Sequence, residues 1–144
     1  MNFSRINLTV LVAVLAGCSS QPVLSGNDPT EVRLRAVGQA YGRAADALKR
    51  PPRNADELRK FLPEVPDTEP TNILTSARDN QPFVVVGGID FRLADATPES
   101  PTVLAYERTV TGGERWAIDY RMTVRRFSEA EFTKVPFPPN HRHP

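Results

Sequence analysis

One short apolar run near the amino terminus marks residues 1–17 as a leader, distinct from the part of this chain that must fold. Residues 6–16 carry no charge, and Arg5 stands just before them. A helix of this length spans roughly 16 Å, about half the hydrocarbon thickness of a bilayer. The run is therefore too short to cross a membrane, and it is typical of the apolar region of a signal peptide. We expect residues 1–17 to be removed on export.

The residues that close this run, Leu15-Ala16-Gly17-Cys18, resemble the lipobox of bacterial lipoproteins. The resemblance implies cleavage between Gly17 and Cys18 and a diacylglyceryl group on the cysteine, with acyl chains such as palmitate. Two or more chains give stable anchoring, so we expect a membrane-anchored protein of the cell envelope. In this family an aspartate after the cysteine commonly marks inner-membrane retention, so Ser19 favours the outer membrane where a cell has two. The alternatives are a secretory cleavage site with a chance cysteine, or a short buried apolar segment.

The remaining chain is long enough for one domain. Residues 18–27 are mostly small and polar, which predicts a flexible tether. Residues 28–135 are expected to form a single α+β domain, followed by a loose, proline-rich tail at 136–144. Cys18 is the one cysteine in the sequence, so no internal disulfide can form and the core alone must hold the domain together.

The first half of the domain reads as two helices. Asp28-Pro29-Thr30-Glu31 offers an N-cap, a proline at the first helical position and an acid in the first turn. Apolar residues then recur at spacings of three and four, which predicts one buried stripe: Leu34, Val37, Tyr41, Ala44 and Leu48. Gly38 and Gly42, four residues apart, suggest close packing of this helix on a sheet. A shorter helix is expected after Asn54, and residues 63–72 are expected to form a loop.

The second half reads as strands. Residues 83–86 form a continuous β-branched run, which predicts a central strand that includes a buried Val85. Further strands are expected at 103–107, 116–118 and 123–127, with a turn at 111–114. Short connections make the strands antiparallel. The expected fold is therefore α+β, with a long and a short helix packed on a sheet of three or four antiparallel strands.

This order of elements resembles bacterial pilins and pseudopilins, especially pilin-like proteins that end in an Asp-Gly-His box. Residues 103–107, a glycine-bearing turn at Gly112-Gly113, a hairpin at 119–122 and the Ser-x-x-Glu-Phe segment at 128–132 carry the likeness. The place of the box reads Arg121-Met122-Thr123, so nothing tied to that box transfers. A lipobox also stands where a filament subunit would have a long apolar helix. The resemblance implies a pilin-like domain tethered by lipid rather than a filament subunit.

No set of residues in the sequence amounts to an active site, so we expect no enzymatic activity and no cofactor. His141 and His143 are the two histidines. A metal site needs three or four rigidly held ligands, so a solvated tail is the simpler interpretation, with a shared metal as the alternative. Several acids have local roles at helix starts and turns. For the others, convergence depends on the fold: Asp90, Asp95, Asp119 and Glu107.

The charge balance excludes one class of partner. The formal net charge is +1, and Arg5 is the one charged side chain before Cys18. Nucleic-acid binding needs a basic excess, so we expect no such partner. The first hypothesis is a non-catalytic structural or adaptor domain whose partner is another envelope protein. The second is a small-ligand or glycan module on the sheet face, with Tyr106 and Trp116 as its contact surface. Exposure of these two aromatic residues would distinguish the hypotheses.

Overall fold

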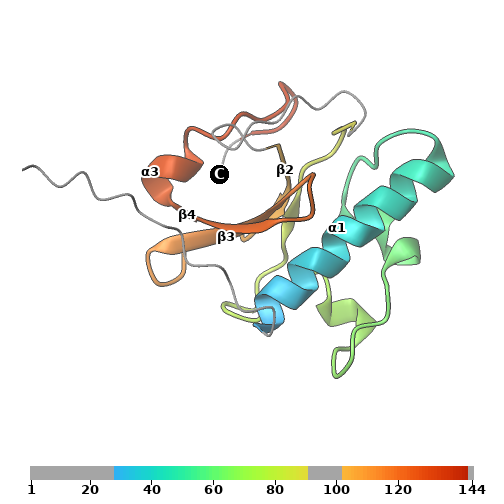
Figure 1. Cartoon of the computed structure of the whole chain (residues 1–144), viewed down its shortest axis with the longest axis horizontal. Coiled ribbons are helices and arrows are strands. Elements are labelled where there is room, and N and C mark those ends of the chain that lie inside the picture. The colour runs from blue at the N-terminus through green and yellow to red at the C-terminus, as the bar shows by residue number, and fades with distance from the viewer. Residues whose placement is uncertain (1–27, 91–101, 143–144) are drawn as a thin grey trace, which may run out of the picture.

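The computed structural model describes residues 28–90 and 102–142. The expected signal peptide, lipid-bearing Cys18, tether and His143 lie outside these residues. The described elements follow one another along the chain as helices first, then strands, then one last short helix (Figure 1). They are α1 (Pro29–Leu48), α2 (Ala55–Leu58), η1 (Arg59–Phe61), η2 (Pro70–Asn72), β1 (Val84–Val85), β2 (Val103–Tyr106), β3 (Glu114–Asp119), β4 (Val124–Ser128) and α3 (Glu129–Phe132).

The strands form one antiparallel sheet in the order β1-β2-β3-β4. This confirms the α+β class. Its centre is β2 and β3, and all four residues of β2 are buried. The prediction that residues 83–86 form a central strand is wrong, because β1 lies at the edge and pairs through two residues. Val85 is half-buried, not fully buried. The apolar run still contributes to the hydrophobic core, because Phe83 and Val86 at its ends are buried there.

Helix α1 begins and packs as its sequence predicts, except in its last turn. The Asp28 carboxylate accepts a hydrogen bond from Thr30 N at 2.8 Å, and Pro29 occupies the first turn. Four members of the apolar stripe are completely buried: Leu34, Val37, Tyr41 and Ala44. The fifth, Leu48, is 37% exposed. Its prediction as a core residue is wrong because a periodic stripe does not show where the helix outruns the sheet beneath it.

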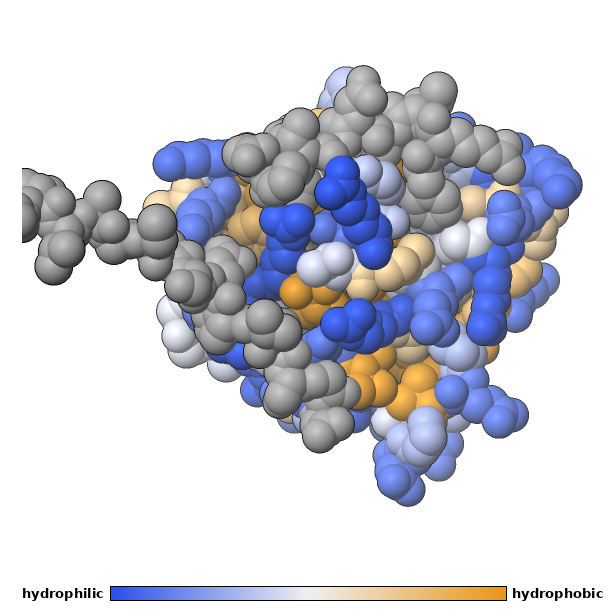
Figure 2. All heavy atoms as spheres, in the orientation of Figure 1, coloured by the Kyte–Doolittle hydropathy of each residue, from blue (hydrophilic) through white to orange (hydrophobic). Residues whose placement is uncertain are grey.

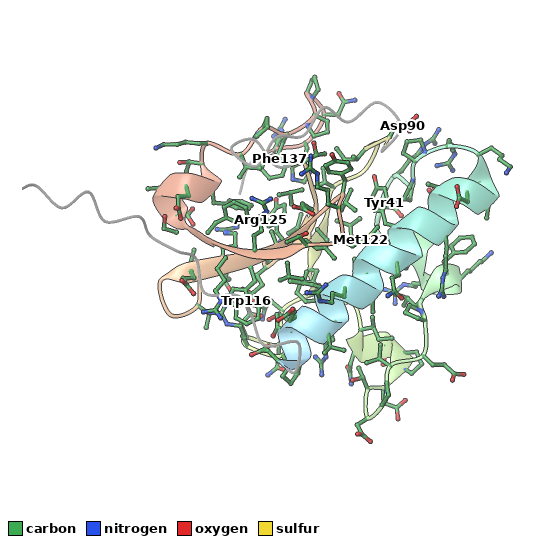
Figure 3. The ribbon with its side chains drawn as sticks, viewed as in Figure 1. Tyr41, Asp90, Trp116, Met122, Arg125 and Phe137 are labelled. Atoms are coloured by element: carbon green, nitrogen blue, oxygen red, sulfur yellow. The ribbon has the colours of Figure 1, made fainter. Side chains whose placement is uncertain are left out.

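The two glycines of α1 differ in their surroundings. A Cβ on Gly38 would lie 2.7 Å from Ile118 Cδ1 and 2.8 Å from Met122 Sδ, whereas a Cβ on Gly42 would meet no described atom within 4 Å. Close packing on the sheet therefore explains Gly38 and does not explain Gly42. Figure 3 shows Met122 beside α1.

The remaining local predictions hold at the caps and turns. Asn54 caps α2, with its Oδ1 accepting from Glu57 N at 3.2 Å. Gly112 and Gly113 both have positive φ, 65° and 81°, as a two-residue hairpin turn with primed geometry requires. Ser128 and Glu131 form the capping box of α3. Residues 63–72, expected to be a loop, contain a tight turn closed by a bridge between Val65 and Thr68 and the short 3-10 helix η2.

The sheet is covered on both sides. Ile118 faces α1, and α1 packs against β2, β3 and β4. On the other face, Tyr106 lies 4.9 Å from Phe132 and 5.6 Å from Phe137 between ring centroids. The expectation of a loose tail is therefore wrong for residues 136–142. Phe137 packs on Phe132 of the neighbouring α3 and on Tyr106 of β2, and β2 is remote from it in the sequence.

Candidate functional site

The two aromatic residues expected to form a contact surface lie on opposite faces of the sheet. Trp116 pairs with Arg126 and shares its face with Ile118, whereas Tyr106 pairs with Ala117 on the other face. Figure 3 shows Trp116 on the opposite side of the sheet from Phe137. Trp116 is 6% exposed and Tyr106 is 1% exposed. The prediction of a contact surface made by these two residues is therefore wrong.

Trp116 is covered by arginines. The Cζ of Arg78 lies 4.8 Å from the centre of its ring, and that of Arg126 lies 5.0 Å away. These distances are within the range of cation–π attraction. The indole Nε1 is buried and has no hydrogen-bond partner among the described residues. The guanidinium groups thus shield the ring from water, and the ring serves as part of the core.

Glu107 is the centre of a buried polar network. It is completely buried, its Oε1 accepts from Ser76 Oγ at 2.7 Å, and its Oε2 accepts from Arg78 Nη1 at 2.6 Å and from Trp116 N at 3.0 Å. Burial raises the pKa of Glu107, while these donors act in the opposite direction. Both oxygens are occupied by structural donors, so the carboxylate has little freedom to exchange a proton with a substrate.

Asp119 plays the equivalent part at the other end of the central strands. Its Oδ1 accepts from the backbone N–H of Arg121 and Thr123, at 2.9 and 3.0 Å, and its Oδ2 accepts from Arg125 Nε at 3.0 Å. These bonds hold the turn between β3 and β4. Asp119 pairs with Val103 at the start of β2, whereas Glu107 follows the end of that strand. The fold therefore separates these two acids, and Asp95 lies outside the described residues.

His141 is held by the aromatic face of the sheet. Its Nε2 lies 2.9 Å from Tyr106 Oη, and its ring centroid lies 4.8 Å from that of Phe137. In the described part of the chain, no group of three or more histidine, cysteine or acidic residues is arranged to hold a metal ion. His141 therefore packs on the aromatic face instead of lying in a solvated tail. The chemistry of tail residue His143 stays a prediction.

The docked tail forms one wall of a cavity of about 340 Å³. The described residues that line it come from three segments: Arg53, Val85, Gly87, Gly88, Asn140 and His141. Sequence reasoning did not find Arg53 or Asn140 as site residues. The Gly87-Gly88 pair was a local signal, but it indicated only the end of a strand. Proximity of these segments could not be inferred, because it depends on the docking of the tail.

Two further hollows lie on the outer side of α1. One, of about 460 Å³, is lined by residues that include Leu48, Lys60 and Phe61, and the other, of about 250 Å³, lies between α1 and Pro63–Pro66. Figure 2 shows that, on the face it presents, hydrophobic residues reach the surface as small patches separated by hydrophilic ones. The cavity beside the tail is distinguished from these two hollows by its combination of a guanidinium, an imidazole and an amide.

Comparisons with known proteins give no family for this chain: no family model, no curated protein and no solved structure matches it. Among residues 28–90 and 102–142, no helix has both the length and the apolar character needed to span a bilayer.

Proposed function

We propose that this chain is a membrane-anchored lipoprotein of the cell envelope, whose folded domain serves as a non-catalytic structural or adaptor module. The observation that carries the proposal is the tetrapeptide Leu15-Ala16-Gly17-Cys18 directly after a short uncharged run. Lipid on Cys18 would place the domain at a membrane surface. Helix α1 begins at Pro29, so ten residues, 18–27, would connect the lipid to the domain. Fully extended, such a tether reaches roughly 35 Å.

The state of two buried acids, Glu107 and Asp119, supports a non-catalytic role. A general acid or base must reach the proton that it transfers. Glu107 and Asp119 instead use all four of their carboxylate oxygens to accept hydrogen bonds from the protein itself. These networks join the turn at residues 76–80 to the sheet and close the β3–β4 hairpin. Their chemistry is that of structural support.

The arrangement of elements supports a pilin-like interpretation of the domain. A long amino-terminal helix packs on a small antiparallel sheet, followed by a capped turn at Ser128. In a filament subunit the apolar amino-terminal helix forms the filament core. This chain has a lipobox in that region, so we propose a single domain presented from the membrane by its lipid. Its partner would be another envelope protein.

The alternative hypothesis of a sheet-face ligand module loses its basis. It required Tyr106 and Trp116 to be accessible, and both are buried. No nucleic-acid partner is proposed, because the charges remain balanced.

A Cys18→Ser variant tests the anchor. Cells are supplied with an alkyne-bearing fatty acid, and the protein is followed by click labelling and detergent partition. The wild type is expected to carry label and enter the detergent phase, and the variant to lose both properties. Ser20→Ala is the matched control and should behave as the wild type. A Cys18→Ser protein that still partitions with the detergent would refute the lipoprotein assignment.

The choice of membrane and the partner need separate tests. Ser19→Asp is expected to move the protein from outer- to inner-membrane fractions in a cell with two membranes, and an unchanged distribution would contradict the role of Ser19.

Crosslinking in intact cells, followed by pull-down, is expected to recover a distinct envelope protein with the wild type. The same partner should be depleted with Cys18→Ser, since that variant leaves the membrane.

A further inference from the structure

The cavity beside the tail has a rigid wall made of backbone. A Cβ on Gly87 would lie 2.1 Å from the carbonyl oxygen of Arg53, so no side chain fits there. Gly88 donates its N–H to the carbonyl of Pro52 at 2.9 Å and has a φ of 80°. The segment after β1 is thereby fixed to the segment before α2. The glycines leave this wall without side chains, and such bare backbone permits a ligand to approach closely.

Arg53 is the one permanent cation among the described residues that line the cavity, and no acid in the described part of the chain pairs with its guanidinium. Glu57, which lies on α2 after Arg53, accepts from both Nη atoms of Arg50 at 2.9 Å and from the backbone N–H of Arg53 at 3.0 Å. These bonds, with that to Arg50 the largest contribution, lower the pKa of Glu57 to about 2. Within the described part of the chain, the Arg53 guanidinium itself makes no hydrogen bond or ion pair.

The opposite wall is the tail, and it is held in place. The His141 ring contacts Tyr106 through a 2.9 Å hydrogen bond and an edge-on approach of the rings, and His141 N donates to the Pro138 carbonyl at 2.9 Å. Asn140 precedes it and contributes an amide to the cavity. Of the described lining residues, one is a permanent cation and none is an acid. The volume of about 340 Å³ is at the lower end of the range of small-molecule sites.

We propose that this cavity binds a small organic oxyanion. A carboxylate or phosphate group would receive charge-assisted hydrogen bonds from Arg53 and a bond from the Asn140 amide. Its carbon skeleton would lie along Val85 and the bare glycine backbone. The site is independent of the lipid on Cys18, so it stands or falls separately from the proposed anchor. The oxyanion could come from a free metabolite or from the headgroup of an anionic phospholipid, and the experiment separates these sources.

The test uses the full mature protein, labelled with ¹⁵N and held in micelles of an uncharged detergent. Inorganic phosphate, glycerol 3-phosphate and butyrate are titrated in turn, with glycerol as the neutral control. Phosphatidylglycerol is titrated into the micelles in a parallel arm. The amide signals of Gly87 and Gly88 and the side-chain amide of Asn140 report on the cavity. We expect saturable shifts at these signals with at least one anion and none with glycerol.

Three variants locate the binding. Arg53→Gln removes the guanidinium and is expected to weaken binding about tenfold or more, the effect of losing a charge-assisted bond. Asn140→Asp places a carboxylate in the cavity and should abolish binding. The matched control is Arg59→Gln, which removes the same charge from an exposed side chain paired with Asp56; its affinity should stay within about twofold of the wild type.

Each outcome bears on the proposal. Arg53-dependent shifts with the free anions identify a soluble ligand. Arg53-dependent shifts with phosphatidylglycerol alone identify a lipid headgroup. Should no probe give saturable shifts at the cavity, or should Arg53→Gln and Arg59→Gln weaken binding equally, the proposal is wrong. Unchanged signals from the α1–sheet core in each variant establish that loss of binding is not loss of the fold.

Discussion

The two glycines of α1 make a matched pair that tests the packing of the helix on the sheet. The same substitution, glycine to alanine, should change the free energy of unfolding in opposite directions at positions 38 and 42. At Gly42 the new Cβ meets no atom of the described residues within 4 Å, so the intrinsic preference of alanine for the helix decides the change in stability. That preference is worth about 1 kcal/mol. Gly42→Ala is therefore expected to raise the melting temperature by about 4 °C.

At Gly38 the same gain is opposed by a collision. The new Cβ would lie 2.7 Å from Ile118 Cδ1 and 2.8 Å from Met122 Sδ, well inside the optimal separation of about 3.5–4.0 Å for carbon atoms. The Met122 side chain is half-buried and can move, but Ile118 is completely buried. Overpacking of a filled core costs about 1–3 kcal/mol. After subtraction of the gain from alanine's helix propensity, Gly38→Ala should lower the free energy of unfolding by about 0–2 kcal/mol.

The measurement is chemical denaturation of both variants and the wild type, followed by circular dichroism. The difference in the free energy of unfolding between Gly38→Ala and Gly42→Ala should be about 1–3 kcal/mol, with Gly42→Ala the more stable. The double variant Gly38→Ala, Met122→Ala should recover part of the loss, because it removes one of the two colliding side chains. Equal stabilisation by both single variants would refute the close approach of α1 to β3.

Three further predictions concern the polar networks and the tail. Glu107→Gln should destabilise the fold by about 2–3 kcal/mol in urea unfolding, because it leaves the charge of Arg78 unpaired next to a buried site; a change within measurement error would contradict the network. Since the folded-state pKa of Glu57 is about 2, below its ordinary value of 4.5, the stabilisation from its pair with Arg50 is present above pH 4.5 and lost as the pH falls through about 2. The melting-temperature gap between wild type and Glu57→Gln should therefore narrow over that window, and a constant gap would exclude this linkage. Phe137→Ala should cost about 2 kcal/mol in the same unfolding assay, since its ring packs on those of Tyr106, Phe132 and His141; no loss would restore the view of a dispensable tail.

Features that depend on neighbours within a few residues could be predicted from the sequence. The cap of α1 at Asp28, the capping box at Ser128 and the glycine turn at 112–113 each lie within one short segment. The buried stripe of α1 also follows from local spacing, as far as Ala44. The α+β class follows in turn, because an apolar stripe and several short strands must bury one another.

Other features were decided by tertiary contacts. Whether residues 83–86 take a central or an edge position depends on which strands lie beside them, and β2 starts far along the chain. Glu107 finds its donors Ser76 and Arg78 at separations of 31 and 29 residues. The burial of Trp116 and Tyr106 likewise depends on which segments pack over each face of the sheet. The alternation of side chains along a strand shows which face a residue lies on, but not what packs over that face.

The tail shows this division most plainly. Its prolines exclude it from the sheet, as its composition predicts, since they provide no backbone donors. Its position was nonetheless decided by an aromatic site on β2 and α3, where Phe137 and His141 meet Tyr106. The cavity with Arg53 exists as a consequence of that docking. Local patterns encode the conformation of each segment. Contact between remote segments depends instead on the free energy of burying particular side chains together. That free energy is determined only once the whole domain has packed.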